Sequence, residues 1–372
     1  MRVALVVPGG VDRTGEYRVI PALLALLSRL ARAHDVDVFA LAQEAQAGEW
    51  PLAGAQIHNI GLHHTRIRAL RAIMARHSLS PFDLVHAIWS GSCGLVAVAA
   101  GALLRIPSLV HVAGGELVAL PEIGYGGRLT WRGRVREQIT LRMASAVTAP
   151  SAPTIAALAA LGVSAQRVPL GVDLGVWPPR EPVPRDPGKS AKLIHVASLN
   201  RVKDQTTLLR ALAVLTQTGV DSHLDIVGED TRAGEVQALA RELGLSDRVA
   251  FHGFLPQRLL RPLVEIAHLL VVSSRHEAGE LVTLEAAVAG VPTVGTSVGH
   301  IAEWAPQAAV AVPVADAAAL AGAIARLLAD EGLRLRIARE ALRRAILEDA
   351  DHTARAFQAI YARLTDARTS QR

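Results

Sequence analysis

The hydrophobic residues of this chain gather in short continuous runs, which alternate with longer segments of helical periodicity. The first run, VALVV, occupies residues 3–7, and LLVV follows much later at residues 269–272. Continuous apolar runs of this length are typical of parallel strands that are covered on both faces. Strands that alternate with helices predict an α/β protein built on parallel sheets.

The first half of the chain carries this alternation to about residue 150. Strands are predicted at 3–7, 35–39, 82–88, 108–112 and 145–149, and helices at 17–33, 67–77 and 94–104. Residues 35–37 formally match D-x-D, a pattern that can hold a metal-bound diphosphate. Their alternating polarity directly after a helix favours a strand instead, so no metal site is predicted.

A proline-rich segment divides the chain. Residues 178–187 contain five prolines in ten, a composition typical of a semi-rigid extended linker. After it, strands are predicted at 192–198, 222–228, 249–254, 269–272, 293–296 and 308–314, and helices at 204–219, 232–243, 257–268, 281–289 and 316–329. We therefore predict a first domain at 1–175, a linker at 176–190, a second domain at 191–350, and a C-terminal segment at 351–372 that is helical to about residue 364.

Composition agrees with two globular domains, because 51% of the 372 residues are hydrophobic and 20% are charged. The net charge of +5 lies in the first half: residues 1–175 hold 16 arginines and 11 acidic residues, and the remaining 23 basic and 23 acidic residues cancel. A basic first half is suited to binding anionic lipid head groups or acidic substrates. The alternative explanation for the excess of arginine is an arginine-rich proteome. With 3% aromatic residues and no basic recognition motif, nucleic-acid binding is not expected.

The single cysteine, Cys93, lies in an apolar stretch and excludes an internal disulfide. The start of the chain is interpreted as a strand and not as a signal peptide. The longest apolar run, residues 94–104, is too short to span a bilayer. We expect a cytoplasmic protein, either free or attached to the inner face of a membrane.

Residues 269–299 form a strand–loop–helix unit with two carboxylates, Glu277 in the loop and Glu285 in the helix. The backbone amides at the helix start, near Leu281 and Val282, can bind a phosphate without a basic side chain. Glu285 could then accept hydrogen bonds from a ribose, and Glu277 from a sugar on the other side of the phosphate. The alternative interpretation is that both are ordinary solvated glutamates.

The stretch HEAGELVTLEAAVAGVPTVGTSVG resembles the E-x7-E signature of the retaining glycosyltransferases of family 4, which have the GT-B fold. The resemblance implies two Rossmann-like domains that face a cleft, an acceptor domain followed by a donor domain, and a C-terminal helix that packs back on the first domain. The family has Pro, Phe and Gly after the first glutamate, whereas this chain has Ala278, Gly279 and Glu280. Glu280 therefore places a charge where a phosphate is expected.

By the same resemblance, a loop after the strand at 192–198 carries two cations, Arg201 and Lys203. The family has Gly-Arg-Leu with a lysine five residues after the arginine, so the position of that arginine is Ser198 here, and Arg201 is the natural replacement. Two fixed cations would offset the charge that develops on a leaving phosphate. We assign Glu277, Arg201 and Lys203 to catalysis. The donor-binding candidates are Glu285, Gly279, Glu280, Leu281, Val282, Gly228, Gly253 and Phe254.

The acceptor or sugar side is expected in the first domain. The family often has a histidine near the transferred sugar, at the position of Ala113, and the nearest imidazole here is His111 on the same face of the strand. His111 is either its substitute or a core histidine. The other candidates are Gly9, Gly10, Gly114, Gly115 and Glu116. A nearby cluster of Arg128, Trp131, Arg132, Arg134 and Arg136 is either a solvated face or an acceptor or membrane surface.

The resemblance and these residues together predict a glycosyltransferase that takes a nucleotide-diphosphate sugar and needs neither a metal nor another cofactor, and the resemblance alone implies that it retains configuration. The acceptor is a glycan, a lipid-linked molecule or a small molecule. One alternative is a nucleotide-sugar 2-epimerase of the same fold. The other is a non-catalytic subunit that binds a nucleotide sugar, which Ala113 and Ser198 make conceivable.

Overall fold

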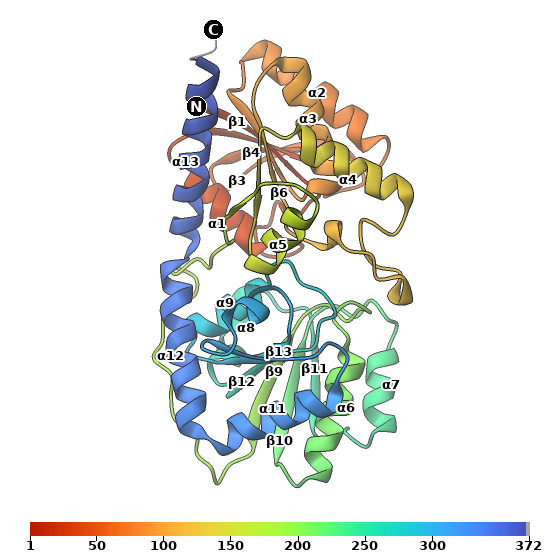
Figure 1. The fold of residues 1–372 in the computed structure, drawn as a ribbon, viewed down its shortest axis with the longest axis vertical. Helices are drawn as coiled ribbons and strands as arrows, with labels where there is room; N and C mark the ends of the chain where they lie inside the picture. The colour runs from red at the N-terminus through yellow and green to blue at the C-terminus, as the bar shows by residue number, and fades with distance from the viewer. Residues whose placement is uncertain (370–372) are drawn as a thin grey trace. The chain divides into compact units, whose positions relative to one another are not determined.

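The computed structural model describes residues 1–369, which divide into two compact units (Figure 1). Unit 1 comprises Met1–Gly171 and the C-terminal segment from Ala350, and unit 2 comprises Val172–Asp349. Each unit is built on a largely parallel sheet with helices on both faces, which confirms the predicted α/β class. Residues 370–372 of the predicted C-terminal segment lie outside the described part of the chain.

The sheet of unit 1 has the strand order β3-β4-β2-β1-β5-β6-β7-β8. Its strands are β1 (Arg2–Val7), β2 (Asp35–Ala40), β3 (Gly48–Leu52), β4 (Ala55–Asn59), β5 (Leu84–Ile88), β6 (Ser108–His111), β7 (Ala146–Ala149) and β8 (Gln166–Arg167). The central strand β1 pairs in parallel with β2 and β5, so Val3 lies beside Val36 and Leu84. The edge hairpin of β3 and β4 is antiparallel and was not predicted. Pro51 in β3 fits there, because an edge strand tolerates a missing N–H donor.

Helices cover both faces of this sheet (Figure 1). One face carries α1 (Pro21–Leu30) and α13 (Ala350–Thr369), and the other carries α2 (Thr65–Leu79) and α3 (Leu95–Leu104). The helix α4 (Trp131–Met143) packs beside α3, and α5 (Ala152–Ala160) packs against β7 and β8. Short helical turns occur at η1 (Ser90–Gly94), η2 (Gly115–Leu117) and η3 (Pro121–Ile123). The buried strands thus have the two covered faces that their continuous apolar runs indicate.

The first helix is shorter than predicted, since α1 begins at Pro21 and not near residue 17. Residues 12–19 form turns instead: the Asp12 carboxylate accepts hydrogen bonds from the backbone and hydroxyl of Thr14, and Val11 bridges Val19. An aspartate that binds the backbone two residues on stabilises a turn in place of a helix. Pro21 then supplies the fixed φ that suits a first helical position.

The C-terminal helix α13 belongs to unit 1 although it follows unit 2 in the chain. Its buried residues Phe357, Ile360 and Tyr361 pack in the core beneath β1 and α1. Arg29 of α1 donates to the Asp351 carboxylate at 2.7 Å. The apolar contacts hold this helix against unit 1, and the ion pair fixes its first turn.

The sheet of unit 2 has the strand order β11-β10-β9-β12-β13-β14, and all neighbours are parallel. Its strands are β9 (Ala191–Val196), β10 (Ser222–Val227), β11 (Val249–Gly253), β12 (Leu269–Val272), β13 (Thr293–Thr296) and β14 (Ala309–Val312). The prediction placed each of these strands within two residues of its ends. Because β9 and β12 are neighbours, the loops that follow them emerge side by side at the carboxyl edge of the sheet.

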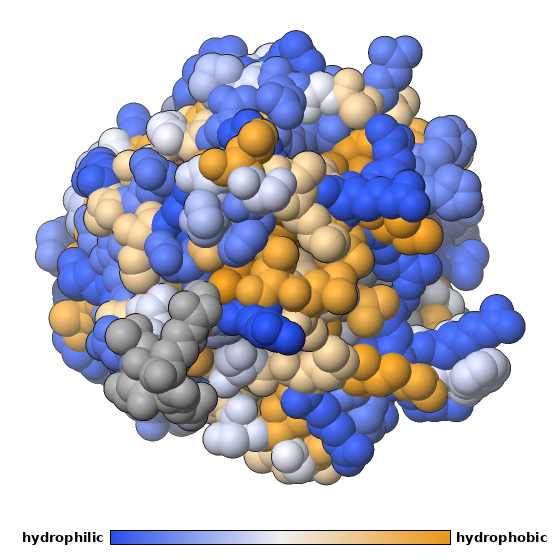
Figure 2. Space-filling model, turned by 90° about the horizontal axis from the view of Figure 1, so that it is seen from above, coloured by the Kyte–Doolittle hydropathy of each residue, from blue (hydrophilic) through white to orange (hydrophobic). Residues whose placement is uncertain are grey.

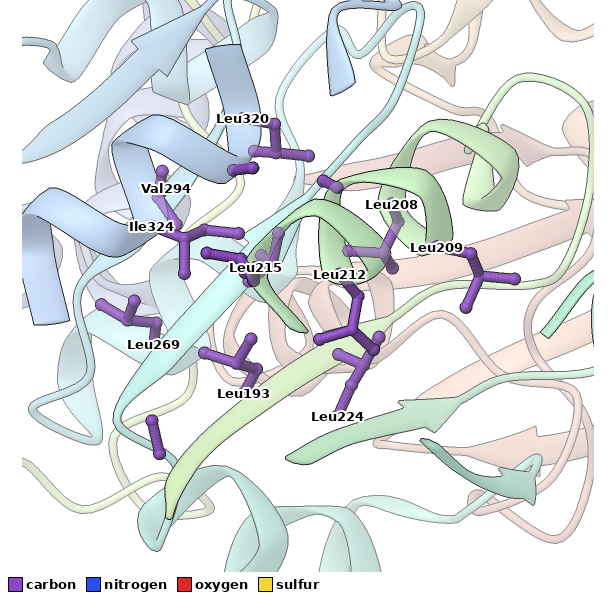
Figure 3. Packing of buried hydrophobic residues seen from close by; sticks show 14 of the residues in the cluster. Leu193, Leu208, Leu209, Leu212, Leu215, Leu224, Leu269, Val294, Leu320 and Ile324 are labelled. Atoms are coloured by element: carbon purple, nitrogen blue, oxygen red, sulfur yellow. The ribbon is translucent and has the colours of Figure 1, made fainter. Parts of the chain in front are cut away.

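One face of this sheet is covered by α6 (Gln205–Gln217), α7 (Glu235–Glu242) and α11 (Ala317–Ala329). Figure 3 shows leucines of α6 turned toward Leu320 and Ile324 of α11, above Leu193 and Leu269 of the strands. The other face carries α8 (Gln257–Glu265), α9 (Leu281–Val288), α10 (Gly299–Trp304) and α12 (Glu331–Leu347). Among residues 1–369, no helix combines the length and the apolar character needed to cross a bilayer.

The proline-rich segment at 178–187 lies within unit 2, whose first residue, Val172, precedes the predicted start of the linker. The segment is bound to unit 2 by side chains. The buried Arg334 of α12 donates to the Val183 carbonyl at 2.7 Å, and Glu331 accepts from the Arg185 amide at 2.8 Å. It is therefore an extended strap along unit 2.

Candidate functional site

Two loops at the carboxyl edge of the unit 2 sheet are joined by hydrogen bonds: the β9 loop (residues 197–204) and the β12 loop (residues 273–280). The Arg275 amide donates to the Val202 carbonyl at 2.7 Å, and the Ser273 hydroxyl donates to the Lys203 carbonyl at 2.8 Å. The Arg275 guanidinium also contacts the Asp204 carboxylate at 3.0 Å. These contacts fix the two loops relative to each other.

Lys203 and Glu277, both predicted as catalytic, meet between these loops. The Lys203 ammonium lies 2.5 Å from Glu277 Oε1, and the Ser274 hydroxyl donates to the same oxygen at 2.6 Å. The two side chains are 25% and 13% exposed, so the pair remains within reach of a ligand. A partly exposed ion pair of this kind can open when a phosphate replaces the carboxylate as the partner of the ammonium.

Arg201 lies two residues before Lys203 in the β9 loop, and it is exposed. Its guanidinium makes no ion pair among the residues that the structure describes. A free guanidinium near the edge of a site retains its full capacity for a two-pronged contact with a phosphate. The structure thus places Arg201 in the expected loop.

Glu280 does not face the start of α9 alone. Its carboxylate accepts hydrogen bonds at 3.1 Å from the backbone amides of His300 and Ile301, at the start of α10. Gly299 makes this approach possible, because a Cβ there would collide with the Glu280 carboxylate. Burial, reinforced by the charge of Glu277, raises the pKa of the Glu280 carboxyl to about 8. Glu280 was predicted to carry a charge close to the phosphate position, and in the structure its carboxylate is turned to the backbone amides of α10.

The start of α9 is open at its backbone. No side chain caps this helix, and its first turn, which begins at Leu281 and Val282, contains no acidic residue. Gly279 lies in the loop just before it. Free amides at a helix start attract anions through the helix dipole. The geometry of this segment is therefore compatible with the predicted phosphate contact.

Glu285, the second glutamate of the motif, is buried one turn into α9. Burial raises the pKa of its carboxyl to about 7, and a hydrogen bond from Gln257 opposes that rise. Gln257 Nε2 donates to Glu285 Oε1 at 2.8 Å. Gln257 opens α8 just after the loop that contains Gly253 and Phe254, so this contact joins that loop to α9. Gln257 was not predicted from the sequence, because it belongs to no motif.

Gly228 and Gly253 end adjacent strands and are hydrogen-bonded, with the Gly228 amide donating to the Gly253 carbonyl at 2.8 Å. Gly228 has φ +151°, and a Cβ there would collide with the Ala197 carbonyl. Gly253 has φ +67° and open space around its Cβ position. Phe254 beside it is 48% exposed. The predicted glycine positions thus support the edge of the site, and Phe254 offers a ring for stacking.

His195 on β9 supports the site from below and was not predicted. It is buried, its Nδ1 lies 2.9 Å from the Val271 carbonyl, and its Nε2 accepts from the Gln205 amide at 3.1 Å. Burial lowers the pKa of this imidazole to about 4. The neutral ring with its proton on Nδ1 satisfies both contacts and links β9, β12 and α6. A histidine inside an apolar strand was the only signal in the sequence.

In unit 1, the backbone at the glycine pair after β1 is bound by a side chain of the same unit. The backbone amides of Gly10 and Val11 both donate to Gln43 Oε1, at 2.6 and 3.0 Å. A Cβ on Gly9 would lie 3.2 Å from that same oxygen. Gly9 and Gly10 were predicted on the acceptor or sugar side, and in the structure the Gln43 side chain makes the close approach to their backbone.

His111 is a core residue and does not face an open site. It is 0% exposed, its Nδ1 lies 2.9 Å from the Thr148 hydroxyl, and its ring packs edge-on against Phe357 of α13. Burial lowers the pKa of this imidazole to about 3. The prediction that His111 takes part in acceptor binding is therefore corrected in favour of the core interpretation. Helices cover both faces of this sheet, so a histidine within one of its strands is enclosed.

The glycine-rich segment after β6 is also tied to the protein. Glu116 is buried and accepts hydrogen bonds from the amides of Ser90 and Gly114, at 3.0 and 2.6 Å. A Cβ on Gly115 would lie 2.5 Å from the Tyr125 ring. Burial raises the pKa of the Glu116 carboxyl. These contacts fix the shape of the loop. Of the acceptor-side candidates in it, Gly114 and Gly115 are partly exposed.

A second buried carboxyl, Glu137 of α4, lies beside this loop and accepts from the Ser90 hydroxyl at 2.5 Å. Burial raises the pKa of the Glu137 carboxyl from 4.5 to about 7. Between these pH values the folded protein keeps a proton that the unfolded chain has released, so this group makes the protein less stable as the pH rises through that window.

We therefore expect Glu137→Gln to raise the unfolding midpoint at pH 8 and to leave it nearly unchanged at pH 4.5. The gain at pH 8 is about 3.5 kcal/mol, because the pKa of this carboxyl rises from 4.5 to about 7 and each pKa unit corresponds to about 1.4 kcal/mol. Denaturant unfolding at the two pH values measures it, with exposed Glu242→Gln as the control. An equal effect at both pH values would contradict the assignment of a buried, protonated carboxyl.

No group of His, Cys, Asp and Glu side chains in the described residues is arranged to hold a metal ion. Asp37, from the formal D-x-D match, lies in strand β2 as predicted. Its carboxylate is shared between Arg2 and His58, each at 2.6 Å, and Arg76 at 3.2 Å. It is therefore already fully paired within unit 1.

Comparison with known families and structures agrees with this arrangement. Residues 180–344 match the family described as glycosyl transferases group 1, and residues 19–172 match the glycosyl transferase 4-like domain. A D-inositol 3-phosphate glycosyltransferase from Thermomonospora curvata is 30% identical over 299 residues, which cover 73% of this chain and 69% of that protein. A second one, from Xylanimonas cellulosilytica, is 30% identical over 223 residues. That match covers 55% of this chain and 52% of the relative, so it spans about half of the relative's length.

Among solved structures, a sucrose-phosphate synthase from Thermosynechococcus elongatus has a TM-score of 0.81 at 21% identity. The alignment covers 99% of this chain and 100% of that one. HepE from Anabaena in complex with UDP-glucose has a TM-score of 0.75 at 19% identity, with 97% and 99% covered. At these identities the similarity establishes the fold.

Proposed function

Since this chain belongs to the glycosyltransferases of GT-B fold, we propose that it transfers a sugar from a nucleotide-diphosphate sugar to an acceptor with retention of anomeric configuration. The observation that carries the proposal is the Lys203–Glu277 pair, held between two hydrogen-bonded loops beside the uncapped start of α9. Such a donor has a diphosphate, which a cation and free helix amides can bind, and a sugar, whose hydroxyls can donate to a carboxylate. HepE, which shares the fold, has been solved with UDP and with UDP-glucose.

In this proposal each group has one partner on the donor. Lys203 and the amides near Leu281 bind the diphosphate, and Lys203 releases Glu277 when it does so. Glu277 then accepts hydrogen bonds from the sugar hydroxyls. Glu285, one turn deeper, accepts from the ribose, with Gln257 fixing its carboxylate. Phe254 lies at the end of the same edge and stacks on the base.

The reaction needs the bond between the sugar and the diphosphate to break, which places negative charge on the leaving phosphate. Fixed cations at this point act where charge develops, so they stabilise the transition state more than the bound donor. Lys203 supplies one such cation, and Arg201 supplies a second when its side chain turns inward. With these two charges in place we propose that transfer requires no metal ion.

The test uses the purified chain with a panel of nucleotide-diphosphate sugars and a set of candidate acceptors. Binding is detected by thermal shift, because a ligand that prefers the folded state raises its apparent stability. Transfer is then followed by nucleoside-diphosphate release, with the product anomer read by NMR. Retention and full activity in excess EDTA are expected. Inversion, or activity that only Mg²⁺ or Mn²⁺ restores, contradicts the proposal, and donor conversion without acceptor indicates the 2-epimerase instead.

Arg201→Lys is expected to be costly, because lysine cannot copy the two-pronged contact of a guanidinium with phosphate. Turnover should fall by roughly ten-fold, and affinity for the donor by less, since charge on the leaving group is greatest in the transition state. Steady-state kinetics separate the two effects. Adding Ser198→Arg in the same background should recover part of the rate. Turnover at the parent rate in Arg201→Lys would show that Lys203 and backbone amides alone hold the diphosphate.

A further inference from the structure

The helix α4 buries two polar side chains beside Leu141 and exposes a stripe of large apolar residues among its arginines. The buried positions include Glu137 and Thr140, at 1% and 0% exposure. The exposed apolar positions are Trp131, Val135, Ile139 and Met143, spaced by four residues, with 63, 48, 43 and 49% of each residue accessible. A surface helix of a soluble domain normally has the opposite arrangement. An exposed apolar stripe on a helix that also buries polar side chains indicates that another surface covers the stripe.

The stripe borders two hollows on unit 1. The larger, of about 620 Å³, lies between α4 and the starts of α2 and α3, and is lined by Arg66, Leu95, Trp131, Val135 and Arg136 among others. The smaller, of about 400 Å³, adjoins Met143 at the other end of α4. Figure 2 shows one face of the molecule, on which apolar side chains lie beside strongly hydrophilic ones. The apolar surface is therefore not flat, and apolar chains can enter it.

The polar residues around the stripe are nearly all arginines. Residues 128–143 contain Arg128, Arg132, Arg134, Arg136 and Arg142 and one acidic residue, the buried Glu137. Arg66 joins them from α2 across the larger hollow. Among the described residues, Arg66, Arg132 and Arg134 make no ion pair. The Arg132 guanidinium lies 5.4 Å from the centre of the Trp131 ring, so charge and aromatic surface are adjacent.

We propose that this face of α4 docks on an anionic lipid bilayer, with Trp131, Val135, Ile139 and Met143 inserted among the acyl chains and the arginines bound to phosphate head groups. Helices that lie in the membrane interface have this combination of an aromatic and aliphatic face with basic residues along its border. Arginine stems pack on the apolar surface while their charged ends reach the head groups. A second copy of the chain is a poor occupant, because a two-fold contact would oppose the arginines of both copies.

The experiment is a flotation assay with the full chain and vesicles of two compositions, phosphatidylcholine alone and phosphatidylcholine with 30 mol% phosphatidylglycerol. We expect binding to the anionic vesicles at low ionic strength, weaker binding as salt is added, and little binding to the neutral ones. Fluorescence gives a second readout. Trp50, Trp177 and Trp304 are buried and Trp89 is half-buried, so only a blue shift of emission on vesicle binding that is absent in Trp131→Phe reports insertion of α4.

Two variants test the two parts of the surface. Trp131→Ser with Ile139→Ser should weaken partition to anionic vesicles by at least ten-fold. Arg66→Gln with Arg132→Gln should weaken it by roughly five-fold for each arginine. The matched controls lie on unit 2, where Ile266 is 51% exposed and Arg339 is an exposed arginine. Ile266→Ser and Arg339→Gln should bind as the parent does.

Three outcomes would overturn the proposal. The first is no binding to anionic vesicles at low salt. The second is equal binding by the parent and both α4 variants, which would place the contact elsewhere. The third is a dimer in analytical ultracentrifugation that Trp131→Ser with Ile139→Ser abolishes while vesicle binding persists unchanged, which would assign the stripe to a second copy. Far-UV circular dichroism of each variant checks that α4 remains folded, and all four changed residues are exposed, so folding should be unaffected.

Discussion

Lys203→Met should lower kcat/KM for sugar transfer by roughly 10²- to 10³-fold. Lys203 contacts Glu277 at 2.5 Å from a loop that is hydrogen-bonded to the loop of its partner, so its ammonium is held in place before a donor arrives. A preorganised charge at the leaving group is typically worth about 3–4 kcal/mol of transition-state stabilisation. Methionine replaces the aliphatic stem of lysine with one of similar length and removes the terminal ammonium. Steady-state kinetics with the donor identified by the panel measure the loss.

The control for this variant is Lys192→Met, an exposed lysine on β9 of the same unit. It should retain the parent kcat/KM, which separates the loss of one charge at the site from the loss of net charge. If Lys203→Met keeps more than a third of the parent kcat/KM, Lys203 is an ordinary partner of Glu277 and the diphosphate is bound by other groups. Thermal unfolding of the variant distinguishes that result from a collapsed loop.

Gly228→Ala should destabilise unit 2 by about 3–5 kcal/mol. Gly228 has φ +151°, a conformation that L side chains rarely adopt, and its Cβ would collide with the Ala197 carbonyl, just after the neighbouring strand β9. Backbone strain and steric overlap of this kind each cost about 1–3 kcal/mol. The contact is with backbone, so no side-chain rotation relieves it. Denaturant unfolding measures the effect as a shift of the unfolding midpoint.

Gly253→Ala is the matched control for Gly228→Ala. Gly253 also has a positive φ, +67°, but nothing lies within 4 Å of its Cβ position. Gly253→Ala should lower the stability of unit 2 by only about 1–2 kcal/mol, the cost of a left-handed conformation. Equal losses in the two variants would show that the strand edge near Ala197 adapts freely, and that the close approach does not fix this part of the site.

The sequence predicted the strands of unit 2 well because each is a short, buried apolar run bounded by turn residues. The family resemblance implied that Lys203 and Glu277 belong to one site, and this agrees with their positions after parallel strands, which end at one edge of a sheet. The sequence could not predict the strand order that makes β9 and β12 neighbours, since pairing between distant segments leaves no local pattern. Gln257 and His195 were missed for the same reason.

Glu280 and His111 show where local patterns mislead. Glu280 lies next to the start of α9 in the sequence, yet its carboxylate binds amides of α10, which only the folded chain brings close. His111 ends a strand, where ligands often bind, but the packing of Phe357 from α13 encloses its ring. That helix is 246 residues away in the chain, and its position could be expected only from the resemblance. Buried polar residues are identified by their tertiary partners, which composition and periodicity do not contain.

The central claim is that Glu277 and Glu285 bind different parts of one donor, and calorimetric titration of a nucleoside diphosphate tests it most directly. The parent, Glu277→Ala and Glu285→Ala are each titrated with the nucleoside diphosphate and with the intact donor. Glu285→Ala should weaken binding of both ligands, because the ribose is common to them. Glu277→Ala should bind the nucleoside diphosphate as the parent does and transfer sugar at least a hundred-fold more slowly. Equal losses of nucleoside-diphosphate affinity in the two variants would contradict the division of roles.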